Sequence, residues 1–205
     1  MTDHYFSTDP RSTDARTAFD ADLWGHRVSL QLASGVFSHG RLDAGTQVLA
    51  RAAEPRPHSR AVLDLGCGTG ALAVGLALTV TEATVWAVDV NERALGLTRA
   101  NAEACEVADR LHVVTPDEVP AAVRFDEIWS NPPIRIGKAA VRELLLGWLA
   151  RLADSGRAVL VIGRNLGADS YQRWLREQGF DCERLASAKG FRVLEVTGRA
   201  AAGPL

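Results

Sequence analysis

The segment from Asp126 to Ile134 joins the end of an apolar strand to an Asn-Pro-Pro sequence that could hold an amine. Proline lacks a backbone N–H, fixes φ, and pushes the preceding residue out of the helical region. Asn131 and Pro132 should therefore be extended, with the Asn131 amide and the Pro132 carbonyl both able to accept hydrogen bonds at one point. A planar NH₂ group on adenine, guanine or a glutamine amide offers two matching donors. A simple proline turn explains these residues equally well, so the choice depends on the preceding chain.

A second candidate site is the glycine-rich segment that follows the strand predicted over residues 61–65. Asp64 precedes Gly66, Gly68 and Gly70, and a helix is expected from Gly70 onward. Glycine permits sharp turns and lets the backbone approach a ligand closely. In a sheet of this kind the loop should lie at the carboxyl edge, where ligands bind.

Asp89 ends the next predicted strand, 89 − 70 = 19 positions after Gly70. A carboxylate there can accept hydrogen bonds from two ribose hydroxyls. This pattern predicts an adenosine-type ligand and leaves NAD and S-adenosylmethionine both open. The alternative role for Asp89 is the N-cap of the helix that begins near Asn91.

The elements that must position these residues follow from the hydrophobic pattern. From residue 61 onward, short apolar runs alternate with helical segments, which predicts a parallel sheet covered on both faces. The last two runs have no intervening helix and should form an antiparallel pair across Lys189-Gly190. The predicted strands cover residues 61–65, 84–89, 111–115, 125–130, 157–162, 181–187 and 191–197. The predicted helices cover residues 70–80, 91–104, 139–153 and 168–178.

The part of the chain before this sheet is expected to pack against it. Residues 1–34 should form an arm and a hairpin, because 17–24 and 27–32 alternate apolar and polar residues around a Gly25-His26 connection. Residues 35–60 should form a glycine-bearing loop and a helix with Asp43 as its N-cap. We expect one domain over residues 1–205, with 61–200 as its core.

Composition narrows the functional classes. Hydrophobic residues make up 47% and charged residues 23% of the chain, which is typical of a folded globular protein. The longest apolar run, 71–80, is too short to span a bilayer, and the first residues lack a secretion signal. Three cysteines without a CxxC pair and five histidines without ligand spacing predict no metal site and a cytoplasmic location. The net charge of −2 counts mildly against an RNA partner.

The pairing of an Asp-x-Gly-x-Gly-x-Gly segment (64–70) with Asn-Pro-Pro-Ile (131–134) resembles class I S-adenosylmethionine-dependent methyltransferases that modify exocyclic or amide nitrogens. Segments 35–38, 42–46, 131–137 and 190–194 extend this resemblance to the methyltransferase-small family. Its RsmC-type members methylate guanine N2 in 16S ribosomal RNA. The resemblance runs from about Tyr5 to Val196.

This resemblance implies a Rossmann-like α/β fold with a mostly parallel seven-stranded sheet, an antiparallel C-terminal pair and an N-terminal hairpin. Some members carry an additional N-terminal copy of the domain, for which this chain has no room. Whatever orients RNA in those members should be missing here or supplied by a partner.

The resemblance also implies roles for individual residues. Cofactor contacts are expected from Phe37, Asp64, Gly66, Cys67, Gly68, Gly70, Asp89, Val90 and Asp117. The amine should be held by the catalytic residues Asn131, Pro132, Pro133 and Ile134. RNA contacts are expected from His39, Arg41, Arg135, Lys138 and Arg192. Core packing for Phe37, a simple turn for Asp117 and a solvated side chain for Lys138 remain alternatives.

The leading prediction is an enzyme that uses S-adenosylmethionine, releases S-adenosylhomocysteine, and methylates guanine N2 in 16S rRNA or the 30S subunit. The alternatives are a protein glutamine amide, tRNA or a small molecule as substrate, or a non-catalytic module that binds S-adenosylmethionine. An NAD oxidoreductase is disfavoured because nothing marks a hydride-transfer acid. We expect no membrane and no metal partner, and the sequence leaves the oligomeric state open.

Overall fold

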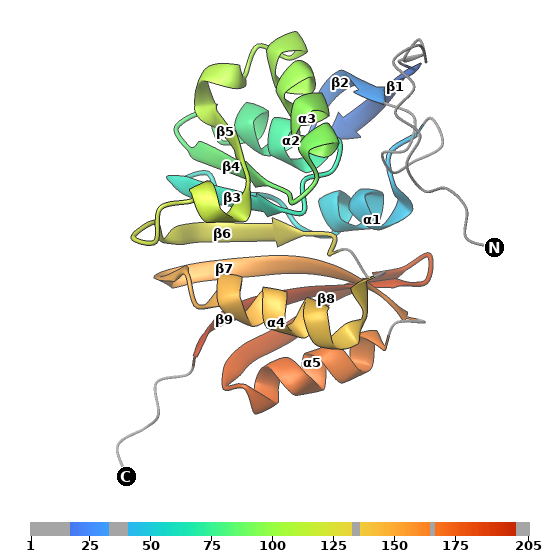
Figure 1. Ribbon diagram of the computed structural model, residues 1–205. Helices are drawn as coiled ribbons and strands as arrows, with labels where there is room; N and C mark the ends of the chain where they lie inside the picture. The colour runs from blue at the N-terminus through green and yellow to red at the C-terminus, as the bar shows by residue number, and fades with distance from the viewer. Residues whose placement is uncertain (1–16, 33–40, 133–135, 165–166, 200–205) are drawn as a thin grey trace, which may run out of the picture.

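The computed structural model describes residues 17–32, 41–132, 136–164 and 167–199. Within them a seven-stranded sheet has the order β5-β4-β3-β6-β7-β9-β8 (Figure 1). Strands β3 to β7 run parallel, whereas β9 is antiparallel to both β7 and β8. A separate antiparallel hairpin, β1–β2, precedes the sheet. The predicted fold class is therefore confirmed.

The strands are β1 Thr17–Leu23, β2 His26–Leu32, β3 Ala61–Leu65, β4 Thr84–Val88, β5 Leu111–Val114, β6 Phe125–Ser130, β7 Leu152–Gly163, β8 Phe180–Ala188 and β9 Phe191–Arg199. The helices are α1 Ala44–Ala52, α2 Ala71–Thr79, α3 Glu92–Ala104, α4 Lys138–Leu149 and α5 Ala168–Glu177, with short 3₁₀ turns η1 Ala108–Arg110 and η2 Pro116–Glu118.

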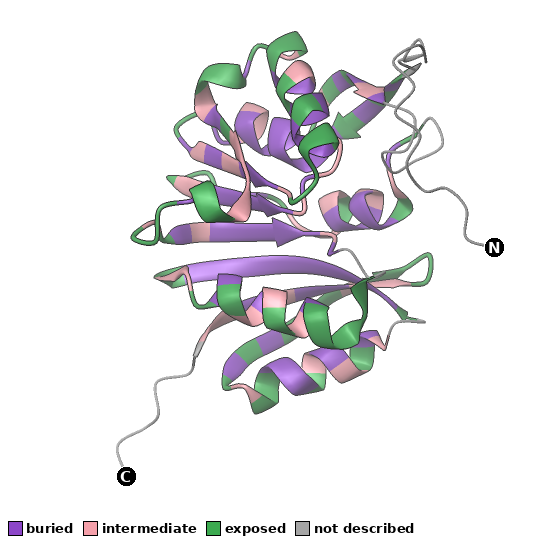
Figure 2. Cartoon of the chain, in the orientation of Figure 1, coloured by how far each residue is buried: buried purple, intermediate pink, exposed green. Residues whose placement is uncertain are grey.

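Helices cover both faces of the sheet (Figure 1). Helices α1, α2 and α3 lie on one face with the hairpin, and α4 and α5 lie on the other. Successive side chains of a strand point to opposite faces, so Val62 packs in the first cluster and Leu63 in the second. Figure 2 shows the central strands buried and the outer helix faces exposed. This arrangement explains why the strands read as continuous apolar runs rather than alternating ones.

The β1–β2 hairpin packs on the main body, as expected, but its turn is one residue earlier than predicted. Trp24 and Gly25 form the turn with φ of 51° and 84°, and His26 already belongs to β2. Positive φ at both central residues is the twist that a two-residue hairpin needs. The Trp24 indole N–H donates to the Ala53 carbonyl at 2.8 Å, and its ring meets Trp129 edge-on at 5.2 Å. This hydrogen bond and the partial burial of the ring against the core favour Trp24 in the turn.

Asn101 in α3 ties the hairpin to the glycine-rich loop. Its side chain is fully buried. Its Oδ1 accepts from the Gln31 N–H at 2.7 Å, and its Nδ2 donates to the carbonyls of Gln31 at 3.1 Å and Thr69 at 2.8 Å. A buried amide with all these bonds satisfied holds its neighbours in one arrangement.

The boundary between α4 and β7 differs from the prediction. The helix ends at Leu149 rather than at residue 153, and the strand begins at Leu152 rather than at residue 157. Leu152 pairs with Phe125 across a bulge. A Cβ added at Gly156 would lie 2.7 Å from the Phe125 carbonyl. Pairing with β6 therefore overrides the helical preference of Leu152 and Ala153.

A buried ionic network fastens the segment before β3 to the sheet. Glu127 is fully buried and accepts from Arg157 Nη2 at 2.9 Å, Ser59 Oγ at 2.7 Å and the Arg56 N–H at 2.6 Å. Arg157 also pairs with Glu195 at 2.7 Å. These charges are tolerated inside the protein because each has several partners.

Among the described residues, no helix is long and apolar enough to cross a membrane.

Candidate functional site

The register of the sheet aligns the carboxyl ends of four neighbouring strands. Leu65 at the end of β3 pairs with Val88 of β4 and Ser130 of β6, and Val88 pairs with Val114 of β5. The residues that follow these ends emerge along one edge: Thr115, Asp89, Gly66 and Asn131. Neighbouring strands lie about 4.8 Å apart, so the backbones of Asp89 and Asn131 leave the sheet roughly 10 Å from each other. The sheet therefore brings both predicted motifs to one place.

The loop between β3 and α2 depends on glycine backbone geometry. Gly66, Gly68 and Gly70 have φ of 76°, 56° and 76°, which residues with a side chain rarely adopt. The Gly66 N–H donates to the Val88 carbonyl at 2.8 Å. A Cβ at Gly70 would lie 2.7 Å from Thr98, whereas one at Gly68 would meet nothing within 4 Å. Gly70 is thus needed for packing against α3, and Gly68 borders open space.

Asp64 lies buried beneath this loop. Its side chain faces α2, where Oδ2 accepts from the Ala73 N–H at 2.9 Å. Among the described residues, Oδ1 has no hydrogen-bond partner. Burial raises the pKa of Asp64 to about 7; the bond from Ala73 opposes this rise, and the charge of Asp89 adds to it. A buried carboxyl with a free oxygen is suited to a donor or cationic group of a ligand.

Asp89 and Val90 follow β4 at the same edge. The Asp89 carboxylate accepts from the Gly68 N–H and the Asn91 N–H, each at 3.0 Å. The N-cap of α3 is Asn91, whose side chain accepts from the Arg93 N–H. The alternative role of Asp89 as that N-cap is therefore wrong. Val90 beside it is an apolar side chain that is 82% exposed, and its contact with an adenine stays a prediction.

Asp117 lies in η2, immediately after β5, and is exposed. Its Oδ1 accepts from the Thr115 hydroxyl at 2.7 Å, and this bond lowers the pKa of Asp117. The predicted turn is present, and Asp117 is negatively charged within it. A contact with an adenine amino group stays a prediction.

Cys67 directs its side chain into the protein. The Sγ lies 3.5 Å from the Thr98 hydroxyl, and burial raises the pKa of the thiol. Its N–H donates to the Val88 carbonyl at 3.1 Å. A ligand role for Cys67 would therefore have to use the main chain near it rather than the thiol.

Asn131 is half-buried at the end of β6, and α1 fixes its side chain. Its Nδ2 donates to Asp43 Oδ2 at 2.7 Å and to the Thr46 hydroxyl at 3.2 Å. Among the described residues, Oδ1 has no partner, and Pro132 beside it is buried. Asp43 is the N-cap of α1, as predicted. Its bond to Asn131 links positions 88 residues apart and has no local sequence signal.

The predicted RNA-contacting residues differ in their surroundings. Arg41 is exposed just before α1. Lys138 begins α4 and donates to Ser170 Oγ at 2.7 Å, so it faces the first turn of α5 rather than pointing away. Arg192 forms an ion pair with Asp169, and its side chain is 14% exposed. Arg192 is therefore less available to an external anion than the other two.

Two exposed basic residues at the same edge were not predicted. Arg164 directly follows β7, and its N–H donates at 2.8 Å to the carbonyl of Gly190 in the β8–β9 turn. Lys189 occupies that turn with φ of 49°. Their proximity results from strand pairing, so the sequence offered no local signal. Five predicted residues lie outside the described part of the chain: Phe37, His39, Pro133, Ile134 and Arg135.

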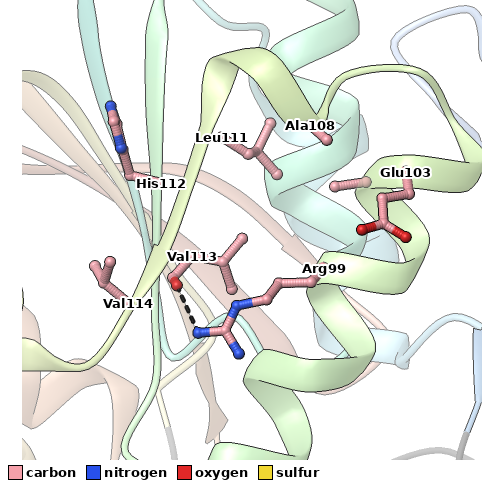
Figure 3. Close-up of a pocket in the computed structure, with 8 residues that line it drawn as sticks. Arg99, Glu103, Ala108, Leu111, His112, Val113 and Val114 are labelled. Carbon is pink, nitrogen blue, oxygen red and sulfur yellow. Dashed lines mark hydrogen bonds between the residues drawn. The ribbon is translucent and has the colours of Figure 1, made fainter.

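A separate hollow of about 330 Å³ lies between α3 and the edge strand β5 (Figure 3). Arg99 crosses it and donates to the Val113 carbonyl at 2.9 Å. None of the predicted site residues lines this hollow. Within the described ranges, no group of three or more His, Cys, Asp or Glu side chains could hold a metal ion.

Comparison with known proteins relates this chain to methyltransferases. The methyltransferase small domain family model matches residues 27–195. A Bacillus subtilis protein named uncharacterized protein YbxB is 30% identical and aligns over 96% of this chain and 98% of its own. A release factor glutamine methyltransferase of Gloeobacter violaceus is 32% identical over 93% of this chain and 74% of its own.

Among solved structures, the 16S rRNA N2 G1207 methyltransferase (RsmC) of T. thermophilus, in complex with AdoMet and guanosine, matches with a TM-score of 0.80. It is 26% identical and covers 93% of this chain and 52% of its own. The chain likewise spans about half the length, 51%, of a matching relative named ribosomal RNA small subunit methyltransferase C, from Chromohalobacter salexigens.

Proposed function

The chain belongs to the methyltransferase small domain family, and on that premise we propose that it methylates the exocyclic N2 amine of a guanine in 16S rRNA, using S-adenosylmethionine. The observation that carries this proposal is the oriented Asn131 amide, which emerges next to the glycine-rich loop on the adjacent strand.

The residues of the loop fit S-adenosylmethionine. The free, buried Oδ1 of Asp64 suits its cationic methionine portion, and the open space at Gly68 leaves room beside the backbone. Asp89 retains lone pairs for ribose hydroxyls, and Val90 offers a surface for the adenine. When bound, the cofactor supplies an electrophilic methyl group on its sulfonium and leaves as S-adenosylhomocysteine.

Asn131 and Pro132 would hold the accepting amine. The Asn131 Oδ1 and the Pro132 carbonyl each accept one of its N–H groups, which directs the nitrogen lone pair toward the cofactor side of the site. Such positioning can lower a barrier by about 7–11 kcal/mol. An amine that has gained a methyl group becomes acidic and can lose its proton to water, so no protein base is required.

The charges along the edge favour a polyanionic substrate despite the net charge of −2. The cofactor end, at β4 and β5, is acidic: Asp89, Asp117 and Glu118. The other end, at α1, α4, β7 and the β8–β9 turn, carries exposed cations: Arg41, Lys138, Arg164 and Lys189. The acidic end suits a sulfonium, and the basic end suits RNA phosphates.

A protein glutamine amide is the second candidate substrate. The release factor glutamine methyltransferase relative covers 93% of this chain. A glutamine side chain also presents two N–H donors in one plane, so the Asn131 and Pro132 acceptors would serve it equally well. The charge separation described above is what favours RNA.

The test is transfer of tritium from S-adenosyl[methyl-³H]methionine to 16S RNA, 30S subunits, tRNA or release factor. We expect label in 16S RNA or 30S subunits, recovered as N2-methylguanosine, with transfer falling steeply as salt rises because phosphate contacts are screened. Asn131→Ala should abolish transfer while cofactor affinity, measured by calorimetry, is retained. Label in release factor alone would favour the second candidate, and an active Asn131→Ala variant would refute the role of the amide.

A further inference from the structure

We propose that Asp43 is a positioning residue that fixes which side of the Asn131 amide meets the substrate, with the Thr46 hydroxyl as a second hydrogen-bond partner of the amide nitrogen. This inference rests on the proposed function, because it concerns the amide that would hold the accepting amine. It adds to the proposed function a reason why the site would accept an amine rather than an oxygen nucleophile.

The argument begins with the two N–H groups of the Asn131 side chain. Nδ2 lies 2.7 Å from Asp43 Oδ2 and 3.2 Å from Thr46 Oγ1, so both of its donors have acceptors on α1. A carboxylate can only accept hydrogen bonds. The Thr46 hydroxyl can donate as well as accept and would tolerate a flipped amide. A flipped amide would, however, place its oxygen against Asp43 Oδ2, so that two acceptors would be in contact and the carboxylate would lose the hydrogen bond from Asn131. The nitrogen is therefore held on the α1 side, and Oδ1 faces the opposite way.

Asp43 is itself held in place by the start of α1. The same Oδ2 accepts from the Gly45 N–H at 2.8 Å and the Thr46 N–H at 3.1 Å. The partial positive charge of a helix N-terminus stabilises a carboxylate at this position. This geometry makes Asp43 a rigid partner for Asn131.

Gly45 lets the helix approach the amide closely. A Cβ added there would lie 3.0 Å from Asp43 Oδ2, 3.1 Å from Asn131 Nδ2 and 3.2 Å from Asn131 Oδ1. Each of these contacts is tighter than a normal one, and neither atom group can move without losing a hydrogen bond. The absence of a side chain at position 45 thus belongs to the same arrangement.

The consequence concerns substrate class. With Oδ1 and the Pro132 carbonyl facing the acceptor, the site offers two acceptors and needs two donors, as an NH₂ group provides. With the amide reversed, Nδ2 would donate toward the substrate and would suit a hydroxyl or carboxylate oxygen instead. Asp43 is therefore expected to determine nitrogen over oxygen acceptors, although it does not touch the substrate.

Three substitutions separate this role from helix capping. Serine caps helices about as well as aspartate, but its hydroxyl is too short to bond Asn131 as well, so Asp43→Ser removes only the bond to the amide. Asp43→Asn can keep an oxygen at the same place and serves as the conservative variant. Thr46→Val removes the second acceptor at nearly constant shape. Hydrogen bonds to charged groups predict that Asp43→Ser lowers kcat about 10- to 100-fold, and Thr46→Val lowers it less.

A merely structural role predicts a different pattern. We expect Asp43→Ser to retain the melting temperature and the cofactor Kd of the wild type, and Asp43→Asn to recover most of the lost kcat. A loss that follows melting temperature across the three variants, or an unchanged kcat in Asp43→Ser, would overturn the proposal.

An NMR measurement keeps the inference independent of activity. The side-chain NH₂ signals of Asn131, assigned by their loss in Asn131→Ala, should exchange slowly with solvent in the wild type and rapidly in Asp43→Ser. A wild type that methylates no substrate but shows this protection would refute the proposed function and leave the orienting bond intact. Fast exchange in the wild type would refute the orienting bond itself.

Discussion

Replacing Asp64 with asparagine should make the stability of the protein less dependent on pH. The carboxyl is buried, and its pKa is raised to about 7 from an ordinary value of 3.8. The folded protein therefore binds a proton more tightly than the unfolded chain does. Its contribution to stability is complete below the unfolded pKa and is lost as pH rises through the folded pKa.

Linkage gives the size of the effect. A pKa of about 7 in the folded state and 3.8 in the unfolded state corresponds to about 2.6 kcal/mol of stability lost between pH 5 and pH 8. For a chain of this length that is a fall of about 5–10 °C in melting temperature. Asparagine keeps the bond from Ala73 and has no charge to bury, so the variant should lack this component.

The assay is urea unfolding of wild type and Asp64→Asn at pH 5 and pH 8, without cofactor. The difference between the two proteins isolates Asp64, because all other titrating groups are shared. Asp181→Asn, an exposed carboxylate in β8, is the matched control and should follow the wild type. Parallel pH profiles for wild type and Asp64→Asn would refute the argument that burial governs this carboxyl.

Two further predictions concern the glycine-rich loop and the buried ion pair of Glu127 with Arg157. Gly70→Ala should destabilise the fold more than Gly68→Ala, because only the former forces a Cβ to within 2.7 Å of Thr98. Gly68→Ala should instead weaken cofactor binding, which calorimetry would show. Equal melting temperatures for the two variants would contradict the predicted difference in stability. Glu127→Ala should lower the free energy of unfolding by about 3–5 kcal/mol, because it leaves Arg157 buried without its main partner. Urea unfolding would reveal this loss, and a loss under 1 kcal/mol would contradict it.

The sequence predicted those parts of the fold that depend on local pattern. The strand–helix alternation, the C-terminal pair across Lys189-Gly190 and the capping of α1 by Asp43 all follow from residues close in the chain. The turn at Trp24 and the start of β7 at Leu152 did not, because tertiary packing decided both. In the first, the partly buried ring of Trp24 packs edge-on against Trp129. In the second, Leu152 pairs with Phe125.

The candidate site likewise has features that a local sequence pattern predicts and others that depend on contacts between distant residues. Its two motifs were found because each couples a residue pattern to a strand end, and parallel strands end at one edge. The bond between Asp43 and Asn131 could not be found, because capping already explained the aspartate and nothing local connected it with a distant amide. Arg164 was missed because no motif marks it, although it too follows the carboxyl end of a parallel strand. Lys189 was missed because the pairing of β7 with β9, which joins distant segments, brings its turn to the same edge.

The three hydrogen bonds of Asn101 indicate that the β1–β2 hairpin cannot be removed without loosening the glycine-rich loop. Without the β1–β2 hairpin, this buried amide would lose two of its bonds and would keep only the one to Thr69 in the glycine-rich loop. Water could replace those two bonds but would not hold the amide in one arrangement, so Thr69, in the loop that must stay ordered to receive a ligand, would lose a fixed partner. The seven-stranded sheet and its helices are therefore not sufficient to keep this loop ordered, and a shortened version of this protein would have to retain the hairpin.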